Sequence, residues 1–287
     1  MSYKRSYLFV PSSSLTLMEK AMNSNADAVI FDLEDGVAIS EKVMARERVK
    51  QYASNHRLKK NIYVRVNEFL SPFWQEDIKA AIESGVCGLV IPKAESPYVI
   101  QKICDEVRRY VKQINRDREE LFEVIPLIET ANGVHFAYEI AKSHCSVKRL
   151  IFGSIDYSLD INCQLSETGE ELLFARSQVV NASRAAGIES PIDAVYSNLS
   201  NEEGLKNEAY RARRLGFTSK LAIHPKQVDA IHIAFTPTLD ELKEAREIVE
   251  AFKVAEEKGI AAISVGDKLV DYPVFQKAKQ LIESAEF

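Results

Sequence analysis

Eight short apolar segments, each followed by a polar break and a longer stretch with helical spacing, are the feature that most limits how this 287-residue chain can fold. The segments are rich in Val, Ile and Phe, residue types that favour β-strands. They span residues 6–11, 28–34, 62–67, 88–93, 123–130, 149–154, 191–197 and 219–225. Eight successive strand-then-helix units predict a closed parallel barrel of the (β/α)8, or TIM-barrel, type.

The main alternative to this barrel is a doubly wound open sheet. If such a sheet held a dinucleotide, it would need a glycine-rich turn after its first strand, and the chain there reads FVPSSS. Length also favours the barrel, because a (β/α)8 domain takes about 250 residues. We therefore predict a catalytic barrel over residues 1–235 and a C-terminal helical extension over residues 236–287, with a hinge at Gly266.

Helix boundaries follow from capping residues. The pattern predicts helices over residues 39–54, 96–114 and 172–187. Ser40 is the expected cap at the start of the first, and Gly187 and Gly216 occupy positions where helices end in a residue tolerant of positive φ.

Composition excludes several classes of function. The chain has 42 acidic and 37 basic side chains, so it lacks the excess positive charge that binds nucleic acid or anionic lipid. It contains no run of the roughly 20 apolar residues that a membrane helix needs, and its N-terminal apolar segment is short for a secretory signal, so we expect a cytoplasmic protein. The four cysteines show no metal-binding spacing and are expected to be thiols without chemistry.

Polar residues close most of the predicted strands. In a (β/α)8 barrel the catalytic groups lie at the C-terminal strand ends, which all open on one face. The polar residues there are Asp32, Glu34, Asp35, Arg65, Asn67, Lys93, Glu129, Asp156, Asp193, Tyr196 and His224. A charge at a strand end can simply meet solvent, but Arg65 and Glu129 lie in or against apolar segments, where an unpaired charge is costly. We expect each of these two to have a partner or a ligand.

Two of these residues suggest a metal site. Glu129 and Asp156 follow the fifth and sixth strands, and neighbouring strands lie about 5 Å apart, so both carboxylates could reach one ion. Two oxygen ligands without His or Cys suit a hard ion such as Mg²⁺, which takes the rest of its shell from water and substrate.

The three carboxylates of IFDLEDG, residues 30–36, are expected to support this site. Asp32 and Glu34 lie on one side of their strand because side chains alternate. We expect Glu34 to hold Arg65 or a metal-bound water, and Asp32 and Asp35 to fix the loop.

An ordered set of motifs covers nearly the whole chain: KRSYLFVP, VIFDLEDGV, VRVN, VIPKAE, PLIETANGV, FGSIDYSLD, ARSQVVNASRAAG, DAVYS and LAIHPKQV. Together they resemble the citrate lyase β-subunit-like branch of the HpcH/HpaI aldolase family. The late segment VGDKLVDYPVFQKA resembles a tail of stand-alone members that cleave or form malyl-CoA, citramalyl-CoA and related thioesters. The chain departs from the family pattern at Ser12 and Ser219, where glycine is usual.

The resemblance implies a carbon–carbon lyase that depends on Mg²⁺, or on Mn²⁺ in its place, and that assembles as a homotrimer or a dimer of trimers. By motif, Glu129 and Asp156 become the metal ligands, and Arg65 and Glu129 bind the substrate. Arg65 and Glu34 count as catalytic, together with Asp271 of the tail, which would be the acid/base group at a neighbouring subunit's site. The residues implied to bind CoA are Phe9, Thr16, Lys20, Ile223 and His224.

The reaction implied is cleavage of a 3-hydroxyacyl-CoA, such as citramalyl-, malyl- or citryl-CoA, into a 2-oxo acid and acetyl-CoA or a homologue. Three alternatives remain: a β subunit of a citrate lyase complex that acts on an acyl-carrier thioester, a metal-dependent 2-oxo acid aldolase, and a barrel without catalytic activity.

Overall fold

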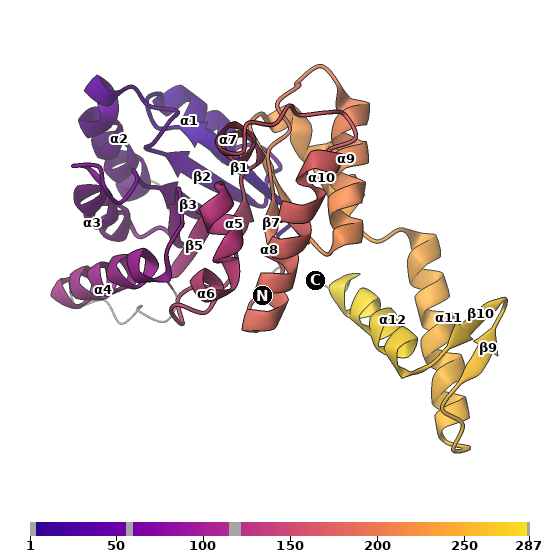
Figure 1. Ribbon diagram of the computed structural model, residues 1–287. Helices are drawn as coiled ribbons and strands as arrows, with labels where there is room; N and C mark the ends of the chain where they lie inside the picture. Colours follow the sequence, from indigo (N-terminus) through magenta and orange to yellow (C-terminus); the bar gives the residue numbers. More distant parts are fainter. Residues whose placement is uncertain (1–3, 56–59, 115–121, 286–287) are drawn as a thin grey trace. The chain divides into compact units, whose positions relative to one another are not determined.

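A closed barrel of eight parallel strands forms the larger part of the chain (Figure 1). The computed structural model describes residues 4–55, 60–114 and 122–285. The strands follow one another around the barrel in sequence order, and β1 pairs with β8 to close it, with Tyr7 opposite Leu221. The strands are β1 Ser6–Pro11, β2 Ala28–Asp32, β3 Asn61–Arg65, β4 Gly88–Ile91, β5 Glu123–Ile128, β6 Ile151–Phe152, β7 Ile192–Asp193 and β8 Ser219–Ala222. The predicted fold is confirmed.

Seven of the eight strands end before the predicted residue. Asp32, Arg65 and Asp193 are the last residues of their strands, and the other polar groups expected at strand ends lie in the loops or helices that follow. β2 shows the physical reason. The Asp32 carboxylate accepts hydrogen bonds from the backbone N–H groups of Glu34 (2.9 Å) and Gly36 (2.9 Å), which turns the chain out of the sheet.

Helices connect the strands on the outside of the barrel. They are α1 Leu15–Met22, α2 Lys42–Asn55, α3 Trp74–Ser84, α4 Pro97–Gln113, α5 Ala131–His135, α6 Ala137–Ala141, α7 Ser154–Asp160, α8 Leu173–Ala186, α9 Glu202–Leu215 and α10 Val228–Phe235. Short 3₁₀ turns precede three of them, at Ile39–Glu41 (η1), Glu170–Leu172 (η3) and Pro225–Gln227 (η4).

The predicted helix ends are confirmed more often than the starts. Gly187 and Gly216 end α8 and α9 with φ angles of 75° and 110°, as the glycine signal indicated. Ser40 caps no helix, because it lies inside η1, whose N-cap position is Ala38. Among the described residues, no helix is both long enough and apolar enough to cross a membrane.

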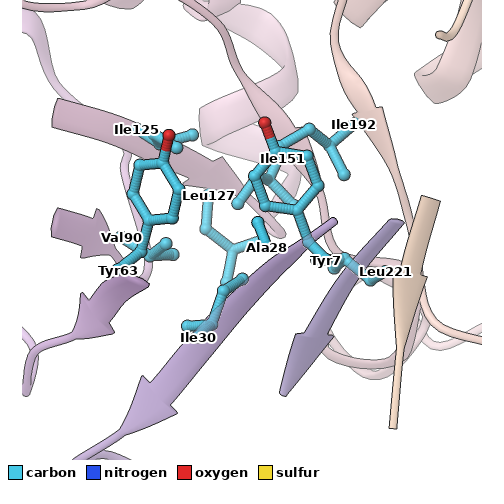
Figure 2. Packing of buried hydrophobic residues seen from close by; sticks show 10 residues of the cluster. All are labelled: Tyr7, Ala28, Ile30, Tyr63, Val90, Ile125, Leu127, Ile151, Ile192 and Leu221. Carbon is cyan, nitrogen blue, oxygen red and sulfur yellow. The ribbon is translucent and has the colours of Figure 1, made fainter. Parts of the chain in front are cut away.

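The barrel interior is filled by inward-facing apolar side chains. Figure 2 shows the cluster, with the Tyr7 and Tyr63 hydroxyls pointing toward the ends at which the strands begin. It consists of Tyr7, Ala28, Ile30, Tyr63, Val90, Ile125, Leu127, Ile151, Ile192 and Leu221. Every one of these is almost fully buried, so the barrel is a packed core and not a channel.

Polar side chains close the N-terminal end of the barrel. The Tyr63 hydroxyl donates to Glu123 Oε2 (2.8 Å), and Arg149 Nε donates to Glu123 Oε1 (2.8 Å). Lys4 Nζ donates to the Tyr63 hydroxyl (3.1 Å). Burial of the Tyr63 ring raises the pKa of its hydroxyl, which therefore stays neutral and can donate. Chemistry in this fold belongs to the opposite face.

Charged residues on the outer side of β7 and β8 form a buried ion cluster. Asp193 accepts from Arg176 Nε (2.7 Å) and Lys220 Nζ (2.6 Å), and its side chain is 0% exposed. Glu208 of α9 completes the set, 2.6 Å from Lys220 Nζ and 3.3 Å from Arg176 Nη2. This cluster fixes α8 and α9 to the strands, so Asp193 is a structural residue.

Residues 234–285 form a second compact unit. It contains α11 Leu239–Glu256, a hairpin of β9 Ile263–Val265 and β10 Lys268–Val270, and α12 Tyr272–Ala285. The rings of Phe252 and Phe275 stack at 4.8 Å in its own small core. The prediction of helices throughout was wrong over residues 263–270, because Gly266, at φ 57°, opens a two-residue turn between the strands.

Removal of the central anion of the buried cluster should destabilise the barrel. Asp193→Ala leaves Arg176 and Lys220 buried with Glu208 as the remaining carboxylate of the cluster, and breaking a buried ion pair typically costs about 3–5 kcal/mol. Urea unfolding followed by the fluorescence of Trp74, the one tryptophan of the chain, measures this in the barrel. The milder Glu208→Gln variant should lower the free energy of unfolding by less.

The matched control is Glu41→Gln, whose ion pair with Arg48 (3.3 Å) is exposed and should matter little. An Asp193→Ala barrel that unfolds at the same urea concentration as Glu41→Gln would show that the cluster does not stabilise the fold.

Candidate active site

Arg65 lies at the end of β3 in a nearly complete shell of partners. Its Nε and Nη2 donate to the two oxygens of Asp32 (2.7 and 2.6 Å), a bidentate pair, and the Phe9 ring lies 5.0 Å from its guanidinium carbon. Burial alone would lower the pKa of Arg65, but the Asp32 carboxylate raises it above its usual value. The guanidinium is therefore a fixed cation at the C-terminal face.

Glu34 lies beside Arg65 without a hydrogen bond to it. Its Oε2 is 2.7 Å from Arg65 Nη1, close enough for an ion pair, yet neither buried oxygen has a hydrogen-bond partner of good geometry. Burial raises the pKa of Glu34 to about 7, although Arg65 opposes the shift. The expected contact of Glu34 with Arg65 is present as this ion pair, whereas the hydrogen bonds to Arg65 are accepted by Asp32, which also fixes the loop.

Glu129 follows β5 and is 3% exposed. Its Oε1 accepts a hydrogen bond from the backbone N–H of Lys93 (2.8 Å). Burial raises its pKa to about 8; the Lys93 N–H acts in the opposite direction, and the charges of Asp156 and Glu34 raise it further. The carboxylate is thus held in place at an electrostatic cost that a cation would relieve.

Asp156 lies in the first turn of α7, just past β6, and not on a strand. It is partly buried, and its charge acts on Glu129 across the gap between the two loops. One turn further along α7, Asp160 Oδ2 accepts from the N–H of Ala131 (2.7 Å). α7 therefore carries a candidate metal ligand and also anchors the loop that follows Glu129.

Gly153, between β6 and α7, lets these elements approach each other. A Cβ atom at this position would lie 2.7 Å from the Glu129 Cβ and 2.9 Å from Glu129 Oε2. Any larger residue would displace the carboxylate, so the close approach requires glycine here.

The chemistry of this set fits a hard divalent cation. Carboxylates, namely Asp32, Glu34, Glu129 and Asp156, outnumber the cations Arg65 and Lys93, and the oxygens of Glu34 are buried without hydrogen bonds. Within the described residues no three His, Cys, Asp or Glu side chains are grouped to hold a metal. Two carboxylates with water and substrate oxygens would therefore form the ligand shell, as Mg²⁺ prefers.

The five residues implied to bind CoA come from two neighbouring parts of the barrel. Phe9 is on β1, and Thr16 and Lys20 are exposed one turn apart on α1, which follows β1. Ile223 and His224 follow β8, the strand that pairs with β1. The structure brings their elements together, but Phe9 is also engaged with Arg65.

A cavity of about 230 Å³ opens beside His224. His224 Nδ1 accepts from the N–H of Lys226 (3.1 Å), so in the neutral ring the proton is on Nε2. The cavity is lined by Asn198, Leu199, Ser200, Asn201, Glu202, Leu205, His224, Lys226 and Gln227.

The two departures from the family pattern lie in different places. Ser12 follows β1 at the C-terminal face and is buried, with a hydroxyl that has no hydrogen-bond partner. Ser219 begins β8, at the opposite end of the barrel from the C-terminal face. Of the two, Ser12 alone lies where a thioester channel would open.

Asp271 directly follows β10 in the second unit. Its Oδ1 accepts from the N–H of Val274 (3.2 Å), the hydrogen bond of a helix N-cap, at the start of α12. Asp271 therefore has a structural role as a helix cap. This hydrogen bond does not prevent the carboxyl group from acting as an acid or base.

Sequence reasoning missed three contributors to the site. The backbone of Lys93, the side chain of Asp160 and the missing side chain of Gly153 all position Glu129. The FGS motif carried a signal for Gly153, since glycine directly after a strand indicates close approach. Asn67, by contrast, is structural, because its Nδ2 donates to buried Asp77 (2.7 Å) on α3.

The fold and this site define a class of barrel protein whose C-terminal face combines the carboxylates Glu129 and Asp156 with a clamped arginine. A sequence model described as HpcH/HpaI aldolase/citrate lyase matches residues 5–225. The chain is 35% identical over 288 residues to the citrate lyase subunit beta of Haemophilus influenzae, covering 100% of this chain and 98% of that protein. It is 29% identical to the mitochondrial citramalyl-CoA lyase of Homo sapiens, covering 98% and 85%.

A solved structure agrees with these matches. CitE from Mycobacterium tuberculosis, in complex with magnesium, acetoacetate and coenzyme A, superposes with a TM-score of 0.81 at 26% identity, covering 99% of each chain. The chain belongs to the HpcH/HpaI aldolase/citrate lyase family. The predicted family and the enzyme class, a lyase, are confirmed by these relatives.

Glu129 should make the metal-free barrel less stable as the pH rises. Because its folded pKa (about 8) is above its ordinary value of 4.5, its contribution to stability is complete below pH 4.5 and is lost as the pH approaches 8. The free energy of unfolding of wild type should therefore fall by up to about 1.4 kcal/mol per pH unit, relative to that of Glu129→Gln, across this window.

Urea unfolding in EDTA at pH 5 to 8, followed by Trp74 fluorescence, measures the difference. Glu244→Gln, a change at an exposed pair with Lys268, is the control and should follow wild type. Parallel curves for wild type and Glu129→Gln would mean that the carboxylate is not held at a raised pKa.

Proposed function

We propose that this chain is a Mg²⁺-dependent lyase that cleaves a 3-hydroxyacyl-CoA of the citramalyl-, malyl- or citryl-CoA kind into a 2-oxo acid and acetyl-CoA or a homologue. The observation that carries the proposal is that buried Glu129 and the clamped Arg65 lie on the same C-terminal face, close enough for their charges to act on each other. The relative bound to magnesium, acetoacetate and coenzyme A supports both the metal and the thioester.

Glu129 and Asp156 would hold the metal ion, Mg²⁺ or Mn²⁺ in its place. A bound divalent ion supplies Lewis-acid polarisation to the oxygen atoms of the reacting centre. The Lys93 N–H fixes Glu129 Oε1, and Asp160 holds the adjoining loop, so this chain presents Glu129 in one orientation before any ligand arrives.

Arg65 binds the oxygen that becomes a carbonyl, or the substrate carboxylate beside it. Its Nε and one Nη2 hydrogen are committed to Asp32, which leaves hydrogens on Nη1 and Nη2 for substrate. Because Asp32 and Glu34 hold the guanidinium rigidly, its stabilisation of developing negative charge requires little reorganisation.

Asp271 acts as the acid that returns a proton to the substrate. As the carbon–carbon bond breaks, the substrate hydroxyl releases its proton to solvent and becomes the carbonyl of the 2-oxo acid. The electron pair of the broken bond passes to the thioester fragment as an enolate, whose carbon takes a proton from the Asp271 carboxyl group. In the reverse direction the same carboxylate removes that proton. We propose that Asp271 serves the site of a neighbouring copy in a homotrimer or a dimer of trimers.

One alternative is favoured by a specific observation. The relatives at 35% identity are β subunits of citrate lyase, so the thioester could be carried by an acyl carrier protein within a complex.

A 2-oxo acid aldolase would use a histidine base, and the Nδ1 atom of His224 already accepts a hydrogen bond from the Lys226 N–H. The CoA-thioester lyase therefore fits the site best.

A panel of thioesters tests the function directly. We expect the purified chain with Mg²⁺ to release an oxo acid from at least one of four thioesters, measured as the hydrazone. Citramalyl-, malyl- and citryl-CoA would give a 2-oxo acid, and 3-hydroxy-3-methylglutaryl-CoA would give acetoacetate, a 3-oxo acid. Release that occurs only from the matching acyl-carrier thioesters would favour the complex subunit. No release from either set, with Mg²⁺ bound, would contradict the proposed activity.

Asp271→Asn should remove turnover without unfolding α12. Asn caps a helix about as well as Asp, so the bond to the Val274 N–H survives while the transferable proton is lost. We expect turnover to fall by about 10²–10⁴, with Mn²⁺ binding and thermal stability unchanged. A turnover near the wild-type value would rule out Asp271 as the acid.

Mixed assemblies test whether Asp271 acts across copies. Asp271→Asn and Glu129→Gln chains, each inactive, should regain about a quarter of wild-type turnover when refolded together, because random assembly places intact partners at one site in four. A mixture that stays inactive while assembling normally would confine Asp271 to its own chain.

A further inference from the structure

Lys93 adopts a backbone conformation that its side chain does not favour. It follows β4, and its φ of 48° lies in the left-handed region, which is the usual territory of glycine and asparagine. Asn162 is the other such non-glycine residue within the described chain, and asparagine adopts that conformation readily. A lysine in this conformation needs a compensating interaction.

That compensation comes from the backbone amide of Lys93. The left-handed turn aims its N–H at Glu129 Oε1 (2.8 Å), and the next N–H, of Ala94, donates to the carbonyl of Leu127 (3.1 Å). Two successive amides of one loop thereby bind the end of β5. The carbonyl of Ala94 also lies against Gly133 of α5, where a Cβ would approach it to 2.7 Å, so α5 is packed closely on this loop.

The side chain of Lys93 points to other carboxylates. Its Nζ lies 3.2 Å from Glu68 and 3.6 Å from Glu34, and it is 41% exposed. The ammonium group is therefore loosely held at the rim of the site, whereas the amide donates to the buried carboxylate of Glu129. The two ends of this residue have separable effects.

We propose that Lys93 is a positioning residue whose left-handed backbone clamps Glu129 Oε1, so that Oε2 alone is presented to a divalent cation. This inference rests on the proposed metal site. It deepens that site by assigning a main-chain clamp, which the side-chain motifs do not reveal.

Two substitutions separate the effect of the Lys93 backbone from the effect of its ammonium group. Lys93→Gly and Lys93→Val both remove the ammonium, but glycine retains the left-handed conformation while β-branched valine opposes it. We expect Lys93→Gly to bind Mn²⁺ within about threefold of wild type. Lys93→Val should bind about 10–100-fold more weakly, the usual cost of losing a group that orients a metal ligand.

Mn²⁺ titration by electron paramagnetic resonance gives the affinities without turnover, and the unfolding midpoint by Trp74 fluorescence shows that each variant is folded. Equal affinities for the two variants would overturn the clamp, whether both bind normally or both bind weakly. If wild type itself binds no Mn²⁺, the metal site and the presentation of Oε2 both fail.

Hydrogen exchange of the Lys93 amide tests the clamp in the absence of metal. In EDTA, Glu129→Ala should speed exchange at this amide by at least about tenfold while the Ala94 amide, bonded to Leu127, stays protected. Unchanged exchange at Lys93 would refute the hydrogen bond on which the proposal depends, independently of any result with Mn²⁺.

Discussion

Closure of the sheet by parallel pairing of β1 with β8 is the constraint on which the rest of the structure depends. Once eight parallel strands form a ring, all their C-terminal ends lie on one face, and residues from β2, β3 and β5 meet there although they are far apart in sequence. The polar layer around Tyr63 and Glu123 closes the other end. Because the interior between the two ends is packed, a substrate can bind only on top of the barrel, at the C-terminal face.

At that face, the balance of buried charge shapes the chemistry. Arg65 is anchored by the two oxygens of Asp32, and Lys93 contributes its amide more firmly than its ammonium. Glu34 and Glu129 therefore keep raised pKa values, caused first by burial. Buried carboxylates in excess of cations are unstable as a group without further positive charge, and this is the physical reason to expect a divalent ion.

Much of the fold could be predicted from the sequence, because strand and helix patterns alternate regularly and Gly187 and Gly216 mark helix ends. The hairpin of β9 and β10 could not, since strands of three residues are too short to show alternation. Strand ends and motifs also pointed to the candidate site residues Arg65, Glu129 and Asp156, whose roles stay predictions. The sequence pattern could not reveal main-chain torsion angles such as φ at Lys93. It also could not show that Arg65 donates its hydrogen bonds to Asp32 and not to Glu34.

The central claim is that Glu129 and Asp156 form one cation site beside Arg65. Anomalous diffraction from crystals of the chain soaked with Mn²⁺ tests it most directly, because the signal locates the metal without reference to activity. We predict one peak within bonding distance of a Glu129 oxygen and an Asp156 oxygen, about 2.0–2.3 Å for such hard-ion ligands. A peak held instead by Asp32, Glu34 and Asp35, or no ordered peak at saturating Mn²⁺, would contradict this account.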